Sequence, residues 1–293
     1  MDEVTFLIQC LNAVQYGLLL FLVASGLTLI FGAMGIINLA HGSFYMMGAY
    51  FAYALAPGVG AHLHGGFFAT LAVGLLLSIA LGYALEWAFF RFLYQRDHLQ
   101  QVLLTYALIL IFEELRSVLV DDDVHGVAMP ASLAGAVPLG NVMTYPVYRL
   151  FISGVCLVVA LGLHLVLSRT RLGMAIRAGT SNREMAQSLG VDVGLLHRVV
   201  FAGGVALAVL AGMIAAPVSS VYPGMGGQVL ILSFVVVVIG GIGSVRGAFV
   251  AALLVGAIDT FGKVVLPGAA GVLVYLMMAA VLLWKPEGLF RLG

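Results

Sequence analysis

Long apolar runs separated by short polar stretches extend along the whole chain of 293 residues. The runs fall at about 6–31, 43–57, 66–90, 101–118, 147–168, 199–221, 228–240, 244–262 and 270–284. A helix that spans a bilayer needs about 20 apolar residues. The runs at 43–57, 228–240 and 270–284 are shorter than this, which favours broken or re-entrant helices. The pattern predicts about eight or nine membrane segments.

Composition agrees with this pattern. The chain is 62% hydrophobic and 9% charged, with a mean hydropathy of +1.13, whereas a soluble domain carries about 25% charged residues. Because the apolar runs are continuous rather than alternating, they predict helices and not barrel strands. We therefore expect an all-α, polytopic helical membrane protein that forms a single transmembrane domain over residues 1–293. A net charge of zero gives no indication of nucleic-acid binding.

Two glycine-rich stretches interrupt the apolar pattern, at 35–43 and at 240–247. Each glycine costs a helix interior about 1 kcal/mol relative to alanine, so both stretches predict helix breaks. Paired breaks in the two halves of a transporter point to its substrate path. Two other interpretations stay open: a polar pair satisfied at a helix end, and glycines that permit close helix packing. The candidate path residues are Asn38, His41, Gly42, Ser43, Gly240, Gly241, Gly243 and Ser244.

One polar segment, 169–198, stands between two apolar blocks and holds five of the 13 Lys and Arg residues. Within it, Ser181 and Glu184 have the spacing of a capping box, and Gly190 stands where a glycine would end the helix. Met185, Ala186 and Leu189 are expected to share one face. A helix this short is marginal alone in water, so it must dock either on its own membrane domain or on a partner.

The distribution of basic residues predicts the orientation of the chain. The stretch 119–146 has no Lys or Arg and contains three consecutive Asp residues, so we expect it outside. The stretches 91–100 and 169–198 carry arginines and are expected inside. These assignments alternate correctly and place the N-terminus outside. Four segments after residue 198 place Lys285 and Arg291, and with them the C-terminus, inside. A single span over 228–262 would instead place the C-terminus outside, but the charge rule favours four segments.

The remaining polar residues predict local pairing and no catalytic chemistry. Glu86 is expected to meet the inner interface or pair with a basic residue, and Asp259 and Lys263 lie one helical turn apart and should pair. His62 and His64 lack a third ligand for a metal site. A nucleotide-binding loop is also missing: Gly262-Lys263 is not followed by Ser or Thr, and the upstream glycine is one residue too far away. We expect no bound cofactor and no ATP hydrolysis by this chain.

Three stretches resemble the branched-chain amino acid permease family of ABC importers: residues 26–50, 173–212 and 234–256. The resemblance implies a bacterial inner-membrane subunit that works by alternating access on branched-chain or related small amino acids, urea or short amides. It implies four partners: a second permease (a relative or a second copy), two ATPase subunits that use ATP and Mg²⁺, and an external substrate-binding protein. In this family the short cytoplasmic helix sits in a cleft of an ATPase subunit. The residues that would form that contact are Arg177, Asn182, Arg183, Glu184, Met185, Ala186, Leu189 and Gly190.

A self-sufficient secondary transporter or channel for a small polar solute is the alternative. Few acidic residues lie deep in the predicted spans, which weakens a proton-coupled carrier. Co-purification with ATPase subunits distinguishes the two functions.

Overall fold

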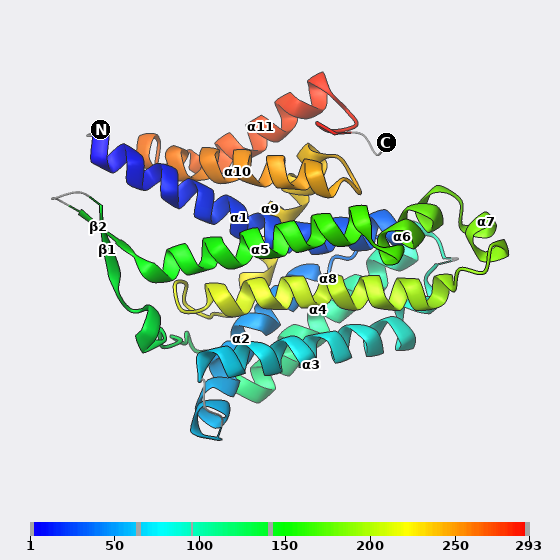
Figure 1. Ribbon diagram of the computed structural model, residues 1–293, viewed down its shortest axis with the longest axis horizontal. Coiled ribbons are helices and arrows are strands. Elements are labelled where there is room, and N and C mark those ends of the chain that lie inside the picture. The colour runs from blue at the N-terminus through cyan, green and yellow to red at the C-terminus, as the bar shows by residue number, and fades with distance from the viewer. Residues whose placement is uncertain (1–2, 63–65, 95, 140–142, 291–293) are drawn as a thin grey trace.

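The computed structural model describes residues 3–62, 66–94, 96–139 and 143–290. Helices account for most of this part of the chain, and one two-stranded sheet accompanies them (Figure 1). The longer elements are α1 (Glu3–Met34), α2 (His41–His62), α3 (Phe67–Ala88), α4 (His98–Val120), α5 (Val147–Arg169), α8 (Val193–Ala215), α9 (Met225–Gly240), α10 (Val245–Val265) and α11 (Ala270–Trp284). The shorter ones are α6 (Arg171–Ser181), α7 (Arg183–Ser188), the 3₁₀ turns η1 (Phe90–Phe92) and η2 (Ala131–Leu133), and the strands β1 (Ala136–Leu139) and β2 (Met143–Pro146).

Each of the nine apolar runs predicted from the sequence corresponds to a helix in the described part of the chain, which confirms a polytopic helical membrane protein. Five of these helices, α1, α3, α5, α8 and α10, are long and apolar enough to cross a membrane. In contrast, α9 and α11 have only 16 and 15 residues. The short runs at 228–240 and 270–284 thus correspond to short helices, whereas the run at 43–57 lies within α2, which has 22 residues.

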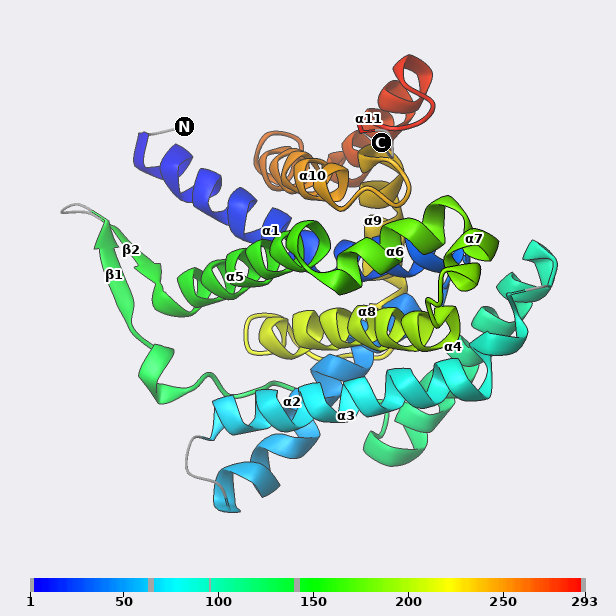
Figure 2. The same cartoon turned by 45° about the vertical axis from the view of Figure 1, so that its right-hand side comes forward.

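The helices run between two ends of the molecule (Figures 1 and 2). We call one end the hairpin end, because it carries β1, β2 and the start of α1. Tyr145 of β2 donates a hydrogen bond of 3.2 Å to Asn12 Oδ1 of α1 there. We call the opposite end the α7 end, because α6 and α7 project from it (Figure 2). The predicted outer stretch 119–146 and the predicted inner segment 169–198 therefore lie at opposite ends.

Helices α2 and α9 begin deep inside the bundle. His41, the first residue of α2, places its Nε2 2.9 Å from the Val23 carbonyl oxygen. Val23 precedes the end of α1 by 11 residues, or about 16 Å at the helical rise, so the chain after α1 turns back along that helix. The first turn of α9 packs directly on α2, since a Cβ added to Gly226 would lie 2.6 Å from the Gly42 carbonyl oxygen. The starts of α2 and α9 therefore lie at a similar depth.

Glycines stand where these helices cross most closely. A Cβ added to Gly26 of α1 would lie 2.5 Å from the Gly204 oxygen of α8, and one added to Gly256 of α10 would lie 2.6 Å from the Gly17 Cα of α1. On α8, Gly212 contacts the backbone of Tyr45 of α2. In lipid, helices associate through van der Waals contact rather than by excluding water, and small residues let the backbones approach. Many of the 37 glycines in the chain thus serve interhelical packing.

Two elements differ from the expectation for the polar segments. Between α4 and α5, β1 pairs with β2 in an antiparallel sheet with Ala136 opposite Pro146 and Pro138 opposite Thr144. No sheet was predicted for this stretch, although a two-stranded sheet has open edges where a proline without N–H is tolerated. Helix α6 was not predicted either. Two predictions concern residues outside the described ones: the histidine at His64 and the inward charge of Arg291.

Candidate functional site

Helix α7 is a short helix with a defined start and a defined end. Asn182 has extended backbone angles, and its Oδ1 accepts a hydrogen bond of 2.9 Å from the Met185 N–H. At the other end, Gly190 adopts φ +87°, as predicted for a terminating glycine. The Val191 N–H donates to the Ala186 oxygen and the Gly190 N–H to the Gln187 oxygen, both at 3.0 Å. This pair of bonds is a Schellman motif, which satisfies carbonyls at the helix end.

The capping box predicted at Ser181 is wrong by one residue. Ser181 is the last residue of α6, so it has a helical backbone and cannot adopt the extended conformation that an N-cap requires. Asn182 takes that role instead. Helix α6 itself begins at a cap, since Thr170 Oγ1 accepts a hydrogen bond of 3.3 Å from the Gly173 N–H. The two caps divide the polar segment into two helices.

The apolar residues of α7 separate into an outward pair and an inward residue. Met185 and Leu189 are 59% and 78% exposed, whereas Ala186 is only 2% exposed. Residues four apart share a helix face, and Ala186 lies about 100° around the helix from Met185. The face predicted to hold all three therefore holds two. Two large apolar side chains are therefore exposed on one face of this otherwise polar segment.

Two of the other residues predicted to contact an ATPase subunit make contacts within the chain. Arg183 places its guanidinium 5.4 Å from the ring centre of Tyr94, in the predicted inner loop before α4. Arg177 of α6 donates a hydrogen bond to the Leu167 carbonyl at the end of α5. Glu184 is exposed on the first turn of α7. Both arginines thus contact the chain's own membrane domain. They are nevertheless exposed, as are Asn182, Glu184, Met185, Leu189 and Gly190.

The first predicted break lies between α1 and α2, and its polar groups are buried. Asn38 and His41 are both 0% exposed. Asn38 Oδ1 accepts a hydrogen bond of 3.1 Å from the Ala40 N–H, and His41 is bonded to α1 through Val23. Ser43 is 4% exposed, and Gly42 is in contact with the backbone of Gly226. In this conformation the four candidate residues face the interior of the chain and hold α2 against α1 and α9.

The second predicted break lies between α9 and α10. Gly241 and Gly243 have φ values of +96° and +81°, which only glycine adopts readily. Ser244 starts α10, because its Oγ accepts a hydrogen bond of 3.1 Å from the Gly247 N–H. Gly240 packs on Gly247, with an added Cβ 2.5 Å from the Gly247 carbonyl carbon. The glycines here bring α9 and α10 together at a sharp turn.

The C-terminal segment covers this second break. The Leu289 N–H donates to the Ile239 oxygen at 2.8 Å, and the Phe290 N–H donates to the Gly240 oxygen at 3.2 Å. These bonds satisfy carbonyls at the end of α9 that have no partner within that helix. No signal in the sequence indicated this contact, since it joins segments about 50 residues apart.

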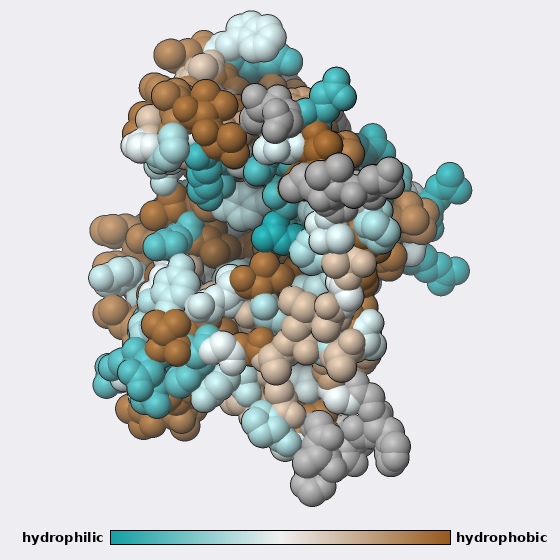
Figure 3. All heavy atoms as spheres, turned by 90° about the vertical axis from the view of Figure 1, so that its left-hand side faces the viewer, coloured by the Kyte–Doolittle hydropathy of each residue, from teal (hydrophilic) through white to brown (hydrophobic). Residues whose placement is uncertain are grey.

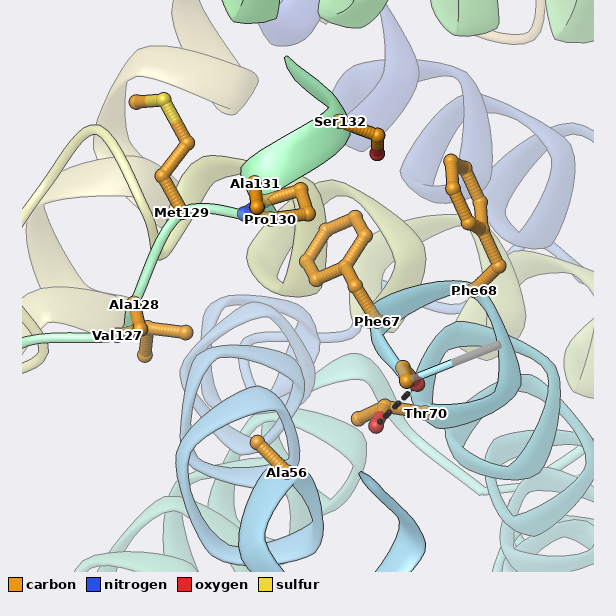
Figure 4. A pocket seen from close by; sticks show the side chains of 11 residues that line it. Ala56, Phe67, Phe68, Thr70, Val127, Ala128, Met129, Pro130, Ala131 and Ser132 are labelled. Atoms are coloured by element: carbon orange, nitrogen blue, oxygen red, sulfur yellow. Dashed lines mark hydrogen bonds between the residues drawn. The ribbon is translucent and has the colours of Figure 1, made fainter. Parts of the chain in front are cut away.

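A cleft of about 530 Å³ lies at the hairpin end, away from both breaks. It is lined by Ala56 of α2, Phe67 and Phe68 of α3 and the stretch 127–132 (Figure 4). The lining contains no charged side chain among the described residues, so it offers no partner for the charges of an amino acid. Elsewhere on the hairpin end, Figure 3 shows hydrophilic residues around a hollow, with hydrophobic residues above and below it.

Comparison with known proteins gives consistent results over nearly the whole chain. Residues 9–282 match a family model described as "Branched-chain amino acid transport system / permease component". The chain is 30% identical to the high-affinity branched-chain amino acid transport system permease protein BraD of Pseudomonas aeruginosa, over 97% of this chain and 95% of that one. It is 27% identical to the corresponding protein LivH of Escherichia coli, over 96% of each chain. A probable LivH of Methanocaldococcus jannaschii is 28% identical over 95% of this chain and 90% of that one.

A solved structure has a similar fold. PsaBC from Streptococcus pneumoniae in complex with Fab superposes with a TM-score of 0.50, covering 93% of this chain and 89% of that one. At 14% sequence identity, this likeness concerns the arrangement of helices.

Proposed function

The chain belongs to the family of branched-chain amino acid transport system permease components, and we propose that it forms part of the membrane path of a bacterial ABC importer. The proposed substrates are branched-chain or related small amino acids. A second permease, homologous or identical, completes the path, and an external binding protein delivers the substrate. Two separate ATPase subunits bind ATP and Mg²⁺, because this chain has no nucleotide-binding loop.

The observation that carries this proposal is the exposed face of α7. Met185 and Leu189 are exposed, and they belong to or directly follow α7, which lies at the α7 end of the molecule (Figure 1). An exposed apolar pair next to Glu184 suits a protein cleft better than lipid headgroups, because a membrane-surface helix would carry a longer apolar face. We therefore assign the ATPase subunit to this surface, which places the α7 end in the cytoplasm and the hairpin end outside.

The two broken regions support alternating access as the mechanism. Helices α2 and α9 start next to each other inside the bundle, where Gly226 meets Gly42. Helices that begin inside the membrane surround the substrate in many transporters, and motion of one bundle against another opens the site to either side. We propose that ATP-driven movement of α7 changes the packing at the breaks and exposes the path residues that are buried in this conformation.

Uptake by a reconstituted complex tests this function. The chain is co-expressed with the products of its genomic neighbours, purified through a tag on the chain, and placed in liposomes. We expect ATPase subunits to co-purify, and labelled leucine to accumulate only with ATP inside and binding protein outside. Labelled urea and a short amide are tested in parallel to define the substrate class. Accumulation that needs no ATPase subunit would instead show a secondary transporter or channel.

A further inference from the structure

A cluster of polar and aromatic residues connects α7 with the membrane helices at the α7 end. Glu86, near the end of α3, is only 1% exposed. Its Oε1 accepts a hydrogen bond from the Tyr94 hydroxyl, and its Oε2 lies 3.6 Å from Nε of Arg198 on α8. The Arg183 guanidinium of α7 lies over the same Tyr94 ring, 5.4 Å from its centre. One buried carboxylate thus joins three parts of the chain.

Two further contacts hold the cluster together. Arg198 Nη1 donates a hydrogen bond of 3.0 Å to the Tyr83 hydroxyl, one turn before Glu86 on α3. The Tyr94 ring also packs against His197 of α8, with ring centres 4.6 Å apart. Tyr94 therefore touches α3, α7 and α8 through different parts of its side chain. Such a residue transfers a displacement of one helix to the other two.

The cost of separating buried groups holds α3 and α8 together at this cluster. A buried carboxylate that loses its partners is unfavourable, which opposes separation of Glu86 from Tyr94 and Arg198. Close packing between α3 and α8 adds to this, since a Cβ on Gly82 would lie 2.8 Å from the Ala202 Cα. As a result, α3 and α8 are expected to move as one body. The connection between α7 and α8 is also short. Asp192, whose side chain caps the start of α8, stands only two residues after Gly190.

We propose that Glu86, Tyr94 and Arg198 are positioning residues that carry the movement of α7 into α3 and α8, and that Arg183 is the residue through which α7 acts on them. This inference rests on the proposed function, because it takes the ATPase subunit as the source of the movement. It assigns these residues a role distinct from docking: the exposed surface of α7 binds the ATPase subunit, and the cluster behind it transmits the motion.

The proposal is tested by asking whether ATP hydrolysis persists while leucine uptake is lost. Glu86→Gln and Tyr94→Phe are compared with the unmodified chain in the reconstituted complex. Both variants keep Met185 and Leu189 intact, so ATPase subunits should co-purify in the normal ratio. We expect basal ATP hydrolysis to persist, while its stimulation by loaded binding protein disappears and leucine uptake falls at least tenfold. Should Glu86→Gln fail to fold, Tyr94→Phe decides alone, because it removes one hydroxyl and keeps the ring under Arg183.

A matched control is available at the other end of the molecule. Glu113 of α4 lies 3.6 Å from Nε of Arg116 at the hairpin end, so Glu113→Gln breaks an acid–arginine pair far from α7 and should leave coupling unchanged. Uptake within twofold of normal in both cluster variants would overturn the proposal. Loss of ATPase co-purification in those variants would also overturn it, since the cluster would then act in docking. Absence of ATPase subunits from the unmodified complex would refute the proposed function itself.

Discussion

Replacing both Met185 and Leu189 with aspartate is expected to abolish ATP-driven uptake while the membrane domain stays folded. The two side chains are 59% and 78% exposed in the isolated chain, so the substitution disturbs few contacts within it. In the complex they would be buried against the ATPase subunit. Burying a large aliphatic side chain contributes about 1.5–3 kcal/mol, so losing two weakens docking by about 3 kcal/mol or more. This corresponds to at least a 100-fold loss of affinity, with the cost of burying the new charges added.

The measurement is co-purification of the ATPase subunits, followed by leucine uptake in liposomes. Val124→Asp is the matched control, because Val124 is 66% exposed and precedes the isolated bridge between His125 and Val221 at the opposite end. Its substitution introduces one aspartate, against two in the double variant, at a similarly exposed position. The docking assignment is wrong if the double variant retains ATPase subunits and transports leucine at the normal rate.

Replacing Gly226 with alanine is expected to destabilise the protein by about 1–3 kcal/mol, which is the usual cost of overpacking a close contact. The added Cβ would lie 2.6 Å from the Gly42 oxygen and 2.9 Å from its carbonyl carbon. These are backbone atoms, which cannot move aside as a flexible side chain can. Helices α2 and α9 would have to separate at the point where both begin, so we also expect uptake to fall.

The neighbouring residue provides the control for this prediction. A Cβ added to Gly227 meets no atom within 4 Å, and Gly227→Ala changes the intrinsic helix propensity by the same amount. The difference in thermal unfolding temperature between the two variants therefore reports the packing alone. Equal unfolding temperatures would show that the contact between α2 and α9 does not hold the break together.

Most of the membrane architecture could be predicted from hydrophobicity, but its detailed packing could not. The nine apolar runs correspond to nine of the described helices. In lipid the backbone N–H and C=O groups must bond to each other, and a helix does this within one segment. The glycines also predicted where helices break. They did not reveal which helices meet, because the contact of Gly42 with Gly226 joins residues far apart in the chain. Strands of four residues, as in β1 and β2, are too short to give a clear alternating pattern.

In the polar segment 169–198, too, features set by neighbouring residues could be predicted, whereas those set by tertiary contacts could not. The terminating role of Gly190 follows from its position alone, and the structure confirms it with φ +87°. The helix start was misplaced because Ser181 and Asn182 are both good caps, and only the length of α6 decides between them. The contact of Arg183 with Tyr94 and the burial of Ala186 depend on residues outside the segment. Among the predicted pairs, Lys263 lies 2.5 Å from Asp259, as expected for residues one helical turn apart.

Site-specific cross-linking from α7 tests the central claim most directly. The native cysteines, Cys10 and Cys156, are first replaced, and Leu189→Cys is introduced into the complete complex in membranes. A short thiol-to-amine reagent is then added. We predict a cross-linked product with the ATPase subunit from Leu189→Cys and none from Val124→Cys. Failure of Leu189→Cys to link to the ATPase subunit, in a complex that transports leucine with ATP, would contradict the assignment of α7 as the docking site.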